Sequence, residues 1–270
     1  MTILEQQKQL CALGLTVDCD GVDGPKTQAA IAKAKASWGD NWELPLIGGI
    51  DVSIWQGVID WGKVAAEHRA QFAYIKASDG CSVDTKFHRN WDHHQSFEIP
   101  CGPYHFFQPE ISVKDQITVF LATFKAAGSD LPPAVDVEVP PKDGKRFASD
   151  LGDFLDGVEH ILGRRAIVYT GVPIDSWVAG ASDTCLDSIA SHELWIAAYV
   201  RTPAIPKIWA DRGKSWRIWQ QNGGVPSPAA EAWRIAGIDT AVDRNVLAGV
   251  ASVAEWASGR TRNELTKGLL

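Results

Sequence analysis

The chain has 270 residues, of which 45% are hydrophobic and 22% are charged. These proportions are typical of a globular protein with a substantial buried core and exclude general disorder. The net charge of -7 and the pI near 5.5 argue against nucleic acid as a partner, because surfaces that bind nucleic acid gather Lys and Arg on one face.

Export and cysteine chemistry are also constrained by the sequence. No stretch approaches the roughly 18 uninterrupted apolar residues of a membrane span, so membrane insertion is not expected. Residues 1–10 lack the basic start and apolar core of a secretory signal, so we expect the chain to stay in the cytoplasm or to leave it by other means. The five cysteines are scattered without a CxxC pair, so we expect reduced cysteines and neither a disulfide framework nor a zinc site.

Two short helices are predicted near the N-terminus. Residues 3–14 form a helical stripe that ends at Gly14, and a second periodic run begins at Thr27. Residues 39–49 carry turn-forming residues and little periodicity. The resulting division has three parts: a helical module at 1–40, a linker at 41–48 and a larger domain at 49–270.

In the larger domain, short apolar runs alternate with amphipathic ones. Eight runs are predicted as strands: 49–55, 72–78, 101–107, 133–139, 166–171, 193–199, 216–221 and 237–243. The predicted helices are 60–69, 87–97, 113–127, 146–162 and 246–256. Alternating strands and helices imply parallel strands with right-handed crossovers, and eight strands suggest a closed α/β barrel of the TIM type. The connections around Ser182 and Ala204 resemble loops, so we expect fewer than eight helices.

Two acids, Asp136 and Glu138, lie in the segment PAVDVEV. They alternate with Val135 and Val137, so both acids project from one face of a strand, at the C-terminal mouth where barrel enzymes place catalytic groups. Such close carboxyl groups cannot comfortably both be charged in a partly dry cleft, so one pKa should rise. Glycoside cleavage requires one protonated and one ionised carboxyl group, and the longer Glu138 is the predicted general acid.

Other interpretations of these acids remain open. An isolated D-x-E at a strand end is also typical of a solvated rim or of a cation site such as a magnesium site. No phosphate-binding glycine loop accompanies it, which argues against a phosphoryl-transfer site. Asp51 and Asp243 should join the pair, because the first and last strands of a closed barrel are neighbours. Their alternative role is capping, or pairing with a cation such as Lys76 or Arg244.

Six segments resemble glycoside hydrolase family 25, the Chalaropsis-type lysozymes, in the family's order over nearly all of residues 48–257. They are DVSIWQGVIDW (51–61), FAYIKASDG (72–80), GPYHFF (102–107), VDVE (135–138), LWIAAY (194–199) and WQQ (219–221). The resemblance implies a flattened eight-stranded barrel that cleaves the β-1,4 bond between N-acetylmuramic acid and N-acetylglucosamine without a cofactor. It implies Glu138 as acid/base, Asp136 as nucleophile or as helper of the substrate's acetamido group, and Asp51 and Asp243 as supporting acids.

Aromatic residues are candidates for contact with sugar rings, because flat ring faces stack on them, and the chain has 12 tryptophans. By the same resemblance the groove would be lined by Trp55, Tyr74, Tyr104, Tyr169, Tyr199, Trp219 and Gln220. Each could equally belong to the core. Asp79 replaces the glutamate that the family usually carries there, and we expect altered positioning of the substrate more than lost chemistry. His105 is expected to be structural.

Residues 10–34 resemble the first part of a peptidoglycan-binding helical module, without its final helix and second DG turn. Wall binding and simple docking on the barrel are the alternatives for this segment. The combined pattern predicts a monomeric, endolysin-like muramidase of a bacteriophage or prophage, which acts on peptidoglycan after a holin-like pore protein releases it. The alternative functions are a non-catalytic glycan-binding protein and a hydrolase of chitin-like polymers.

Overall fold

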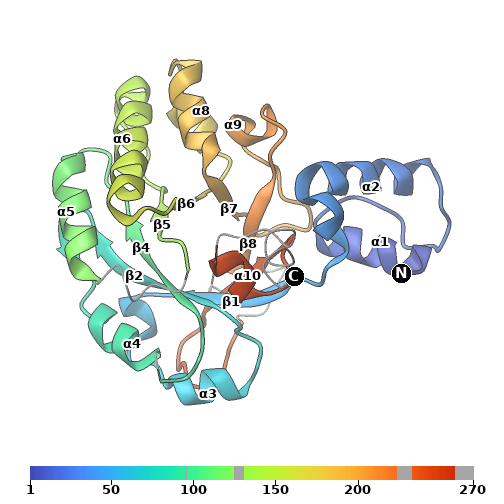
Figure 1. Ribbon diagram of the computed structural model, residues 1–270, viewed down its shortest axis with the longest axis horizontal. Helices are drawn as coiled ribbons and strands as arrows, with labels where there is room; N and C mark the ends of the chain where they lie inside the picture. Colours follow the sequence, from blue (N-terminus) through green and yellow to red (C-terminus); the bar gives the residue numbers. More distant parts are fainter. Residues whose placement is uncertain (95, 125–130, 224–232, 259–270) are drawn as a thin grey trace, which may run out of the picture.

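A closed barrel of strands forms the centre of the molecule (Figure 1). The computed structural model describes residues 1–94, 96–124, 131–223 and 233–258. The strands are β1 (Ile47–Val52), β2 (Ala73–Asp79), β3 (Ser82–Val83), β4 (Cys101–Phe106), β5 (Ala134–Asp136), β6 (Ile167–Thr170), β7 (Glu193–Ala197), β8 (Trp216–Gly223) and β9 (Asp243–Leu247).

The strand order among the described residues is β1-β9-β8-β7-β6-β5-β4-β2-β3, and an additional pairing of β1 with β2 closes the barrel. The short β3 lies outside the ring as a hairpin partner of β2. The other eight strands form the predicted α/β barrel. Neighbouring strands are parallel along the series β1, β2, β4, β5, β6, β7 and β8. The strand β9 is antiparallel to both of its neighbours, β8 and β1. The expectation of parallel strands is therefore wrong for the last strand.

The last strand also begins later than predicted. The predicted run 237–243 is a coil up to its final residue, because Gly237 has φ +92° and a Cβ there would lie 2.3 Å from the carbonyl oxygen of Asp60. Ile238 and Val242 are buried in this coil, so the segment carries apolar residues although it is not a strand. Antiparallel pairing with β8 needs no crossover helix.

The helices lie mainly outside the barrel (Figure 1). They are α1 (Ile3–Ala12), α2 (Pro25–Trp38), η1 (Gly39–Glu43), η2 (Ile54–Gln56), α3 (Trp61–Ala66), α4 (Phe87–His94), α5 (Val113–Thr123), α6 (Gly144–Leu162), α7 (Ile174–Trp177), α8 (Asp183–Ser191), α9 (Lys207–Ala210) and α10 (Val253–Ala257).

The structure differs from the predicted helices at two places, around Ser182 and at the final helix. The predicted loop around Ser182 is the start of α8, where the Ser182 hydroxyl accepts a hydrogen bond from the Cys185 amide as an N-cap. The predicted final helix is shorter, because residues 246–247 belong to β9 and Gly249 has φ +75°. Residues 125–127 of the predicted helix 113–127 lie outside the described residues.

The N-terminal helices form the predicted hairpin and dock on the barrel. A capping box of Thr2 and Glu5 starts α1, and a proline starts α2. Trp38 at the end of α2 donates a hydrogen bond from Nε1 to the carbonyl oxygen of Trp216 at 2.9 Å. Leu10, Ala34, Trp38 and Trp42 share one buried cluster with the outer face of the barrel. Packing and a buried hydrogen bond thus anchor these helices.

Large side chains fill the barrel interior below its C-terminal mouth. Phe72, Tyr74, Tyr169 and Trp195 belong to one buried cluster inside the ring. Gly49 makes room for them, because a Cβ there would lie 2.3 Å from the Phe72 ring. This packed cluster forms the floor beneath the C-terminal mouth. No helix among the described residues is long and apolar enough to cross a membrane.

Candidate active site

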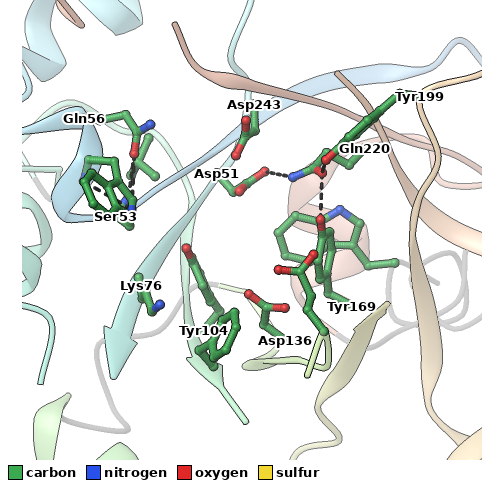
Figure 2. Close-up of a pocket in the computed structure, with 15 residues that line it drawn as sticks. Asp51, Ser53, Gln56, Lys76, Tyr104, Asp136, Tyr169, Tyr199, Gln220 and Asp243 are labelled. Carbon is green, nitrogen blue, oxygen red and sulfur yellow. Dashed lines mark hydrogen bonds between the residues drawn. The ribbon is translucent and has the colours of Figure 1, made fainter. Parts of the chain in front are cut away.

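A cavity of about 230 Å³ opens at the C-terminal mouth of the barrel (Figure 2). Its lining comes from all eight strands of the ring and the segments that follow them: Asp51, Val52, Ser53, Trp55, Gln56, Lys76, Tyr104, Phe106, Asp136, Glu138, Tyr169, Trp195, Tyr199, Gln220 and Asp243. This lining includes all four of the predicted acids, which therefore converge on one pocket.

Asp136 and Glu138 face the cavity because of strand alternation at the end of β5. Their neighbours Val135 and Val137 are buried in the cluster between the strands and the helices, so the two acids point the other way. Asp136 ends the strand and is only 8% exposed, whereas Glu138 lies at the exposed rim. The buried Oδ1 of Asp136 has no hydrogen-bond partner among the described residues.

The environment favours the protonated form of both acids. Desolvation raises the pKa of Asp136 well above its usual range, and the charge of Glu138 adds to this effect. Desolvation also raises the pKa of Glu138, the hydrogen bond with the Tyr169 hydroxyl lowers it in part, and the charge of Asp51 raises it further. The ammonium group of Lys76 opposes both shifts. The pair can therefore hold a proton at a pH where an ordinary carboxyl group has lost it.

Asp51 and Asp243 form a second acidic pair. They are direct register partners on the antiparallel strands β1 and β9, and their side chains point toward one another (Figure 2). Asp51 is 7% exposed, and its Oδ2 accepts hydrogen bonds from Gln220 Nε2 at 2.9 Å and Asn245 Nδ2 at 2.6 Å. Desolvation and the neighbouring charge of Asp51 raise the pKa of Asp243 to about 9.

Four of the predicted aromatic residues and Gln220 line the same cavity. Trp55 lies on η2 at the rim and is 80% exposed, and Tyr199 is 54% exposed. Tyr104 and Tyr169 are buried deeper in the mouth. Gln220 Oε1 accepts hydrogen bonds from the hydroxyls of Tyr169 at 2.8 Å and Tyr199 at 2.6 Å (Figure 2). The rim thus offers exposed ring faces, and the floor offers fixed polar groups.

Three predicted groove residues are not part of the cavity lining. Tyr74 lies deeper, fully buried, with its hydroxyl bonded to the carbonyl oxygen of Pro132. Asp79 pairs with Lys76 and accepts a hydrogen bond from Gln108. Trp219 belongs to the outer cluster, because it adjoins the inward-facing Gln220 and consecutive strand residues face opposite sides.

The sequence prediction missed several residues of the site. Trp195 lines the cavity. Asn245 is not part of the lining and donates a hydrogen bond to Asp51, which is. Placing the last strand at its true position would have indicated Asn245, since residues 243, 245 and 247 alternate on one face. Lys76 was considered only as an ion-pair partner. Its ammonium nitrogen lies 4.3 Å from the centre of the Phe106 ring, inside the lining.

His105 occupies a buried position outside the cavity lining, as the sequence suggested. Its Nδ1 lies 2.8 Å from the Ser78 hydroxyl and its Nε2 lies 3.1 Å from Gln116 Oε1. Desolvation lowers the pKa of His105 to about 4, so it is neutral at ordinary pH. A neutral histidine with both nitrogens bonded has a structural role.

Comparison with known proteins adds independent support to this geometry. Residues 50–226 match the model of the family described as Glycosyl hydrolases family 25. The Escherichia coli K12 protein YegX is 34% identical over 211 residues, which cover 75% of this chain and 70% of YegX. Lysozyme M1 of Streptomyces globisporus is 27% identical over 219 residues, which cover 76% of this chain and 69% of the lysozyme.

Solved structures show the same fold. A bacterial lysozyme from Streptomyces coelicolor superposes with a TM-score of 0.65 at 25% identity, covering 80% of this chain and 98% of the lysozyme. A muramidase from Acremonium alcalophilum superposes with a TM-score of 0.63 at 26% identity, covering 79% of this chain and 99% of the muramidase. The family model, the relatives and the fold agree, and the chain belongs to glycosyl hydrolases family 25.

Proposed function

We propose that this chain is an N-acetylmuramidase that hydrolyses the β-1,4 bond between N-acetylmuramic acid and N-acetylglucosamine in peptidoglycan. The observation that carries the proposal is the Asp136 and Glu138 pair in one cavity, where both pKa values are raised. One protonated and one ionised carboxyl group are what glycoside hydrolysis requires. The names of Lysozyme M1 and the Acremonium muramidase support the choice of substrate.

Desolvation and exposure together support Glu138 as the general acid. Desolvation raises the pKa of Glu138, so this group can hold a proton at a pH where an ordinary glutamate has lost it. Glu138 is also the more exposed of the two acids, since Asp136 is only 8% exposed. A glycosidic oxygen can therefore reach the proton of Glu138.

The proposed reaction uses the two acids in turn. Glu138 donates its proton to the glycosidic oxygen while the bond from that oxygen to the sugar C1 breaks. The carboxylate of Asp136 stabilises the positive charge that develops at C1, either by bonding to C1 or by orienting the substrate's acetamido group for attack. A water molecule then attacks C1, the bond from C1 to the Asp136 carboxylate or to the acetamido oxygen breaks, and Glu138 takes up the proton that this water loses. The reaction needs no metal or cofactor.

We also propose a cellular role for this activity, which rests on the sequence resemblance alone. The proposed role is that of an endolysin-type lysozyme, which acts on the bacterial wall after a pore-forming protein releases it from the cytoplasm. The helical hairpin of α1 and α2 would then add contacts to the wall. Wall binding by residues 1–40 and this cellular route are separate from the catalytic proposal.

The test compares Glu138→Gln with Glu110→Gln, a matched change of an exposed glutamate that lies outside the cavity and pairs with Lys142. Purified wild type and Glu110→Gln should clear suspensions of permeabilised bacteria and release new reducing ends. Glu138→Gln should lose at least roughly a hundredfold of this activity while its melting temperature is kept. Binding without new reducing ends would support a glycan-binding protein, and cleavage of chitin oligomers alone would change the substrate.

A further inference from the structure

We propose that Trp195 and Asn245 are positioning residues that fix the shared proton of the Asp51 and Asp243 pair on Asp243 and leave Asp51 as the carboxylate. Neither residue touches the proposed reacting atoms, and both act through Asp51. The placement of the proton is independent of the proposed function. Only its effect on activity rests on the muramidase proposal.

The indole of Trp195 sets the orientation of Asn245. Both side chains are buried, at 2% and 0% exposure, and come from β7 and β9. Trp195 Nε1 lies 2.8 Å from Asn245 Oδ1. An indole N–H can only donate, so the oxygen of Asn245 must face the indole. The amide hydrogens of Asn245 are therefore directed at Asp51 Oδ2, 2.6 Å away.

A second amide confirms that Asp51 Oδ2 is an acceptor. Gln220 Nε2 donates to the same oxygen at 2.9 Å, while the Gln220 oxygen is occupied by the hydroxyls of Tyr169 and Tyr199. Two amide donors on one oxygen stabilise the ionised form of Asp51. Asp51 and Asp243 are register partners, and the hydrogen bond between them lowers the pKa of Asp51 and raises that of Asp243. We therefore assign the proton of this bond to Asp243. The pair carries one negative charge, and that charge sits on Asp51.

This charge matters for the rest of the cavity. The charge of Asp51 raises the pKa values of Asp136 and Glu138, so its location helps to set the pH range in which those acids share a proton. Other titratable groups line the same cavity as Asp51 and Asp243 and come from the strands around the ring. They are Lys76 from β2, Tyr104 from β4, Asp136 and Glu138 from the end of β5, Tyr169 from β6, and Tyr199 after β7. The three tyrosines stay neutral because their pKa values are raised by burial.

The direct test is carboxyl carbon NMR of the full-length protein with ¹³C-labelled aspartate. Asp51 should be ionised and Asp243 protonated at pH 7. In Trp195→Phe and Asn245→Ala, the titration of Asp51 should move to higher pH and that of Asp243 to lower pH, because the donors that favour ionised Asp51 are weakened or lost. Asn90→Ala, which changes a buried asparagine outside the cavity lining, should leave both titrations unchanged.

Activity gives a second readout. Trp195→Phe should lower kcat roughly tenfold or more with little change in KM, and should shift the pH profile of kcat, because a hydrogen bond in a charged network is lost. Trp195→Phe also keeps the test available if Asn245→Ala does not fold. Unchanged aspartate titrations in a folded Trp195→Phe, or a protonated Asp51 in the wild type, would overturn the proposal. The NMR result stands whatever the enzyme cleaves.

A separate observation concerns the N-terminal helices. The Sγ atoms of Cys11, on α1, and Cys19, in the turn before α2, lie 3.3 Å apart and both are free thiols. We infer that these two residues form a disulfide when the chain meets a disulfide oxidant. The two thiols lose two protons and two electrons to form one S–S bond, and the oxidant RSSR is reduced to two RSH. The bond would tie the end of α1 to the turn that hydrogen-bonds to Gln7.

Peptide mapping of the full-length protein after treatment with oxidised glutathione tests this inference. A peptide that links Cys11 to Cys19 should appear, while the exposed Cys81 should carry glutathione. In Cys11→Ser, Cys19 should carry glutathione instead, and Cys185→Ser should leave the linked peptide in place. Separate glutathione adducts on Cys11 and Cys19, or unreacted thiols at both positions while Cys81 reacts, would overturn it.

Discussion

The ammonium nitrogen of Lys76 lies 3.0 Å from Oδ2 of Asp79, and this ion pair borders the cavity that holds Asp136 and Glu138. The side chain of Lys76 is 15% exposed, so solvent screens its charge only in part. Its positive charge lowers the pKa values of both acids. Asp79 lies outside the cavity lining and pairs with the cation that faces the two acids.

Lys76→Met should move both limbs of the activity profile to higher pH. Loss of the cation favours the protonated forms, so each acid ionises later as the pH rises. Activity at pH 5 should fall more than activity at pH 8. Lys76→Arg keeps the charge and should retain a profile close to that of the wild type. Coincident profiles for Lys76→Met and the wild type would show that this cation does not tune the pair.

Trp55→Ala should weaken substrate binding and leave the chemistry intact. The ring is 80% exposed at the rim of the cavity, where it can stack on a sugar. Loss of one stacking contact is worth about 1 kcal/mol, so KM for soluble glycan fragments should rise roughly fivefold at constant kcat. Trp55→Phe should lose less. An equal fall in kcat with KM unchanged would contradict a binding role.

Trp38→Ala should destabilise the fold by about 3–5 kcal/mol, because it removes a buried ring that joins α2 to the barrel. Trp38→Phe keeps most of the packing and loses the hydrogen bond to Trp216, so it should lose less. Urea unfolding measures both changes. The matched control is Trp55→Ala, whose exposed ring should contribute less than roughly 0.5 kcal/mol to stability. Similar stabilities for Trp38→Ala and the wild type would indicate that the helices dock loosely.

Asp243→Asn should make the stability of the protein less sensitive to alkaline pH. Native Asp243 keeps its proton up to about pH 9, whereas the unfolded chain releases it near the ordinary pKa of roughly 3.9. Between these values the native state binds more protons, so this group's contribution to stability falls as pH rises. The free energy of unfolding should decline more steeply from pH 5 to 9 in the wild type than in Asp243→Asn. Parallel declines would contradict the raised pKa.

Much of the fold follows from patterns that are local in the sequence. The two-residue alternation around Val135 and Val137 predicts both the strand and the shared direction of Asp136 and Glu138. The barrel follows from repeated strand and helix patterns. The coil that contains Ile238 escaped this reasoning, since it carries buried apolar residues as a strand would, and the close approach of Gly237 to Asp60 is a contact between distant parts of the sequence.

The parts of the site that were missed depend on register between distant strands. Asn245 meets Asp51 only because β9 pairs with β1, and Trp195 meets Asn245 across the barrel interior from β7. No spacing in the sequence encodes these contacts. Trp219 is a different kind of error, because the sequence alone could have avoided it. Trp219 and Gln220 are consecutive residues of one strand, so only one of them can face the cavity.

The proposed muramidase activity is tested most directly by mass analysis of the fragments released from purified peptidoglycan after borohydride reduction. We predict disaccharide fragments that end in reduced N-acetylmuramic acid, produced by the wild type and absent with Glu138→Gln. Fragments that end in reduced N-acetylglucosamine, free stem peptides, or no fragments at all from a folded wild-type protein would contradict the proposal.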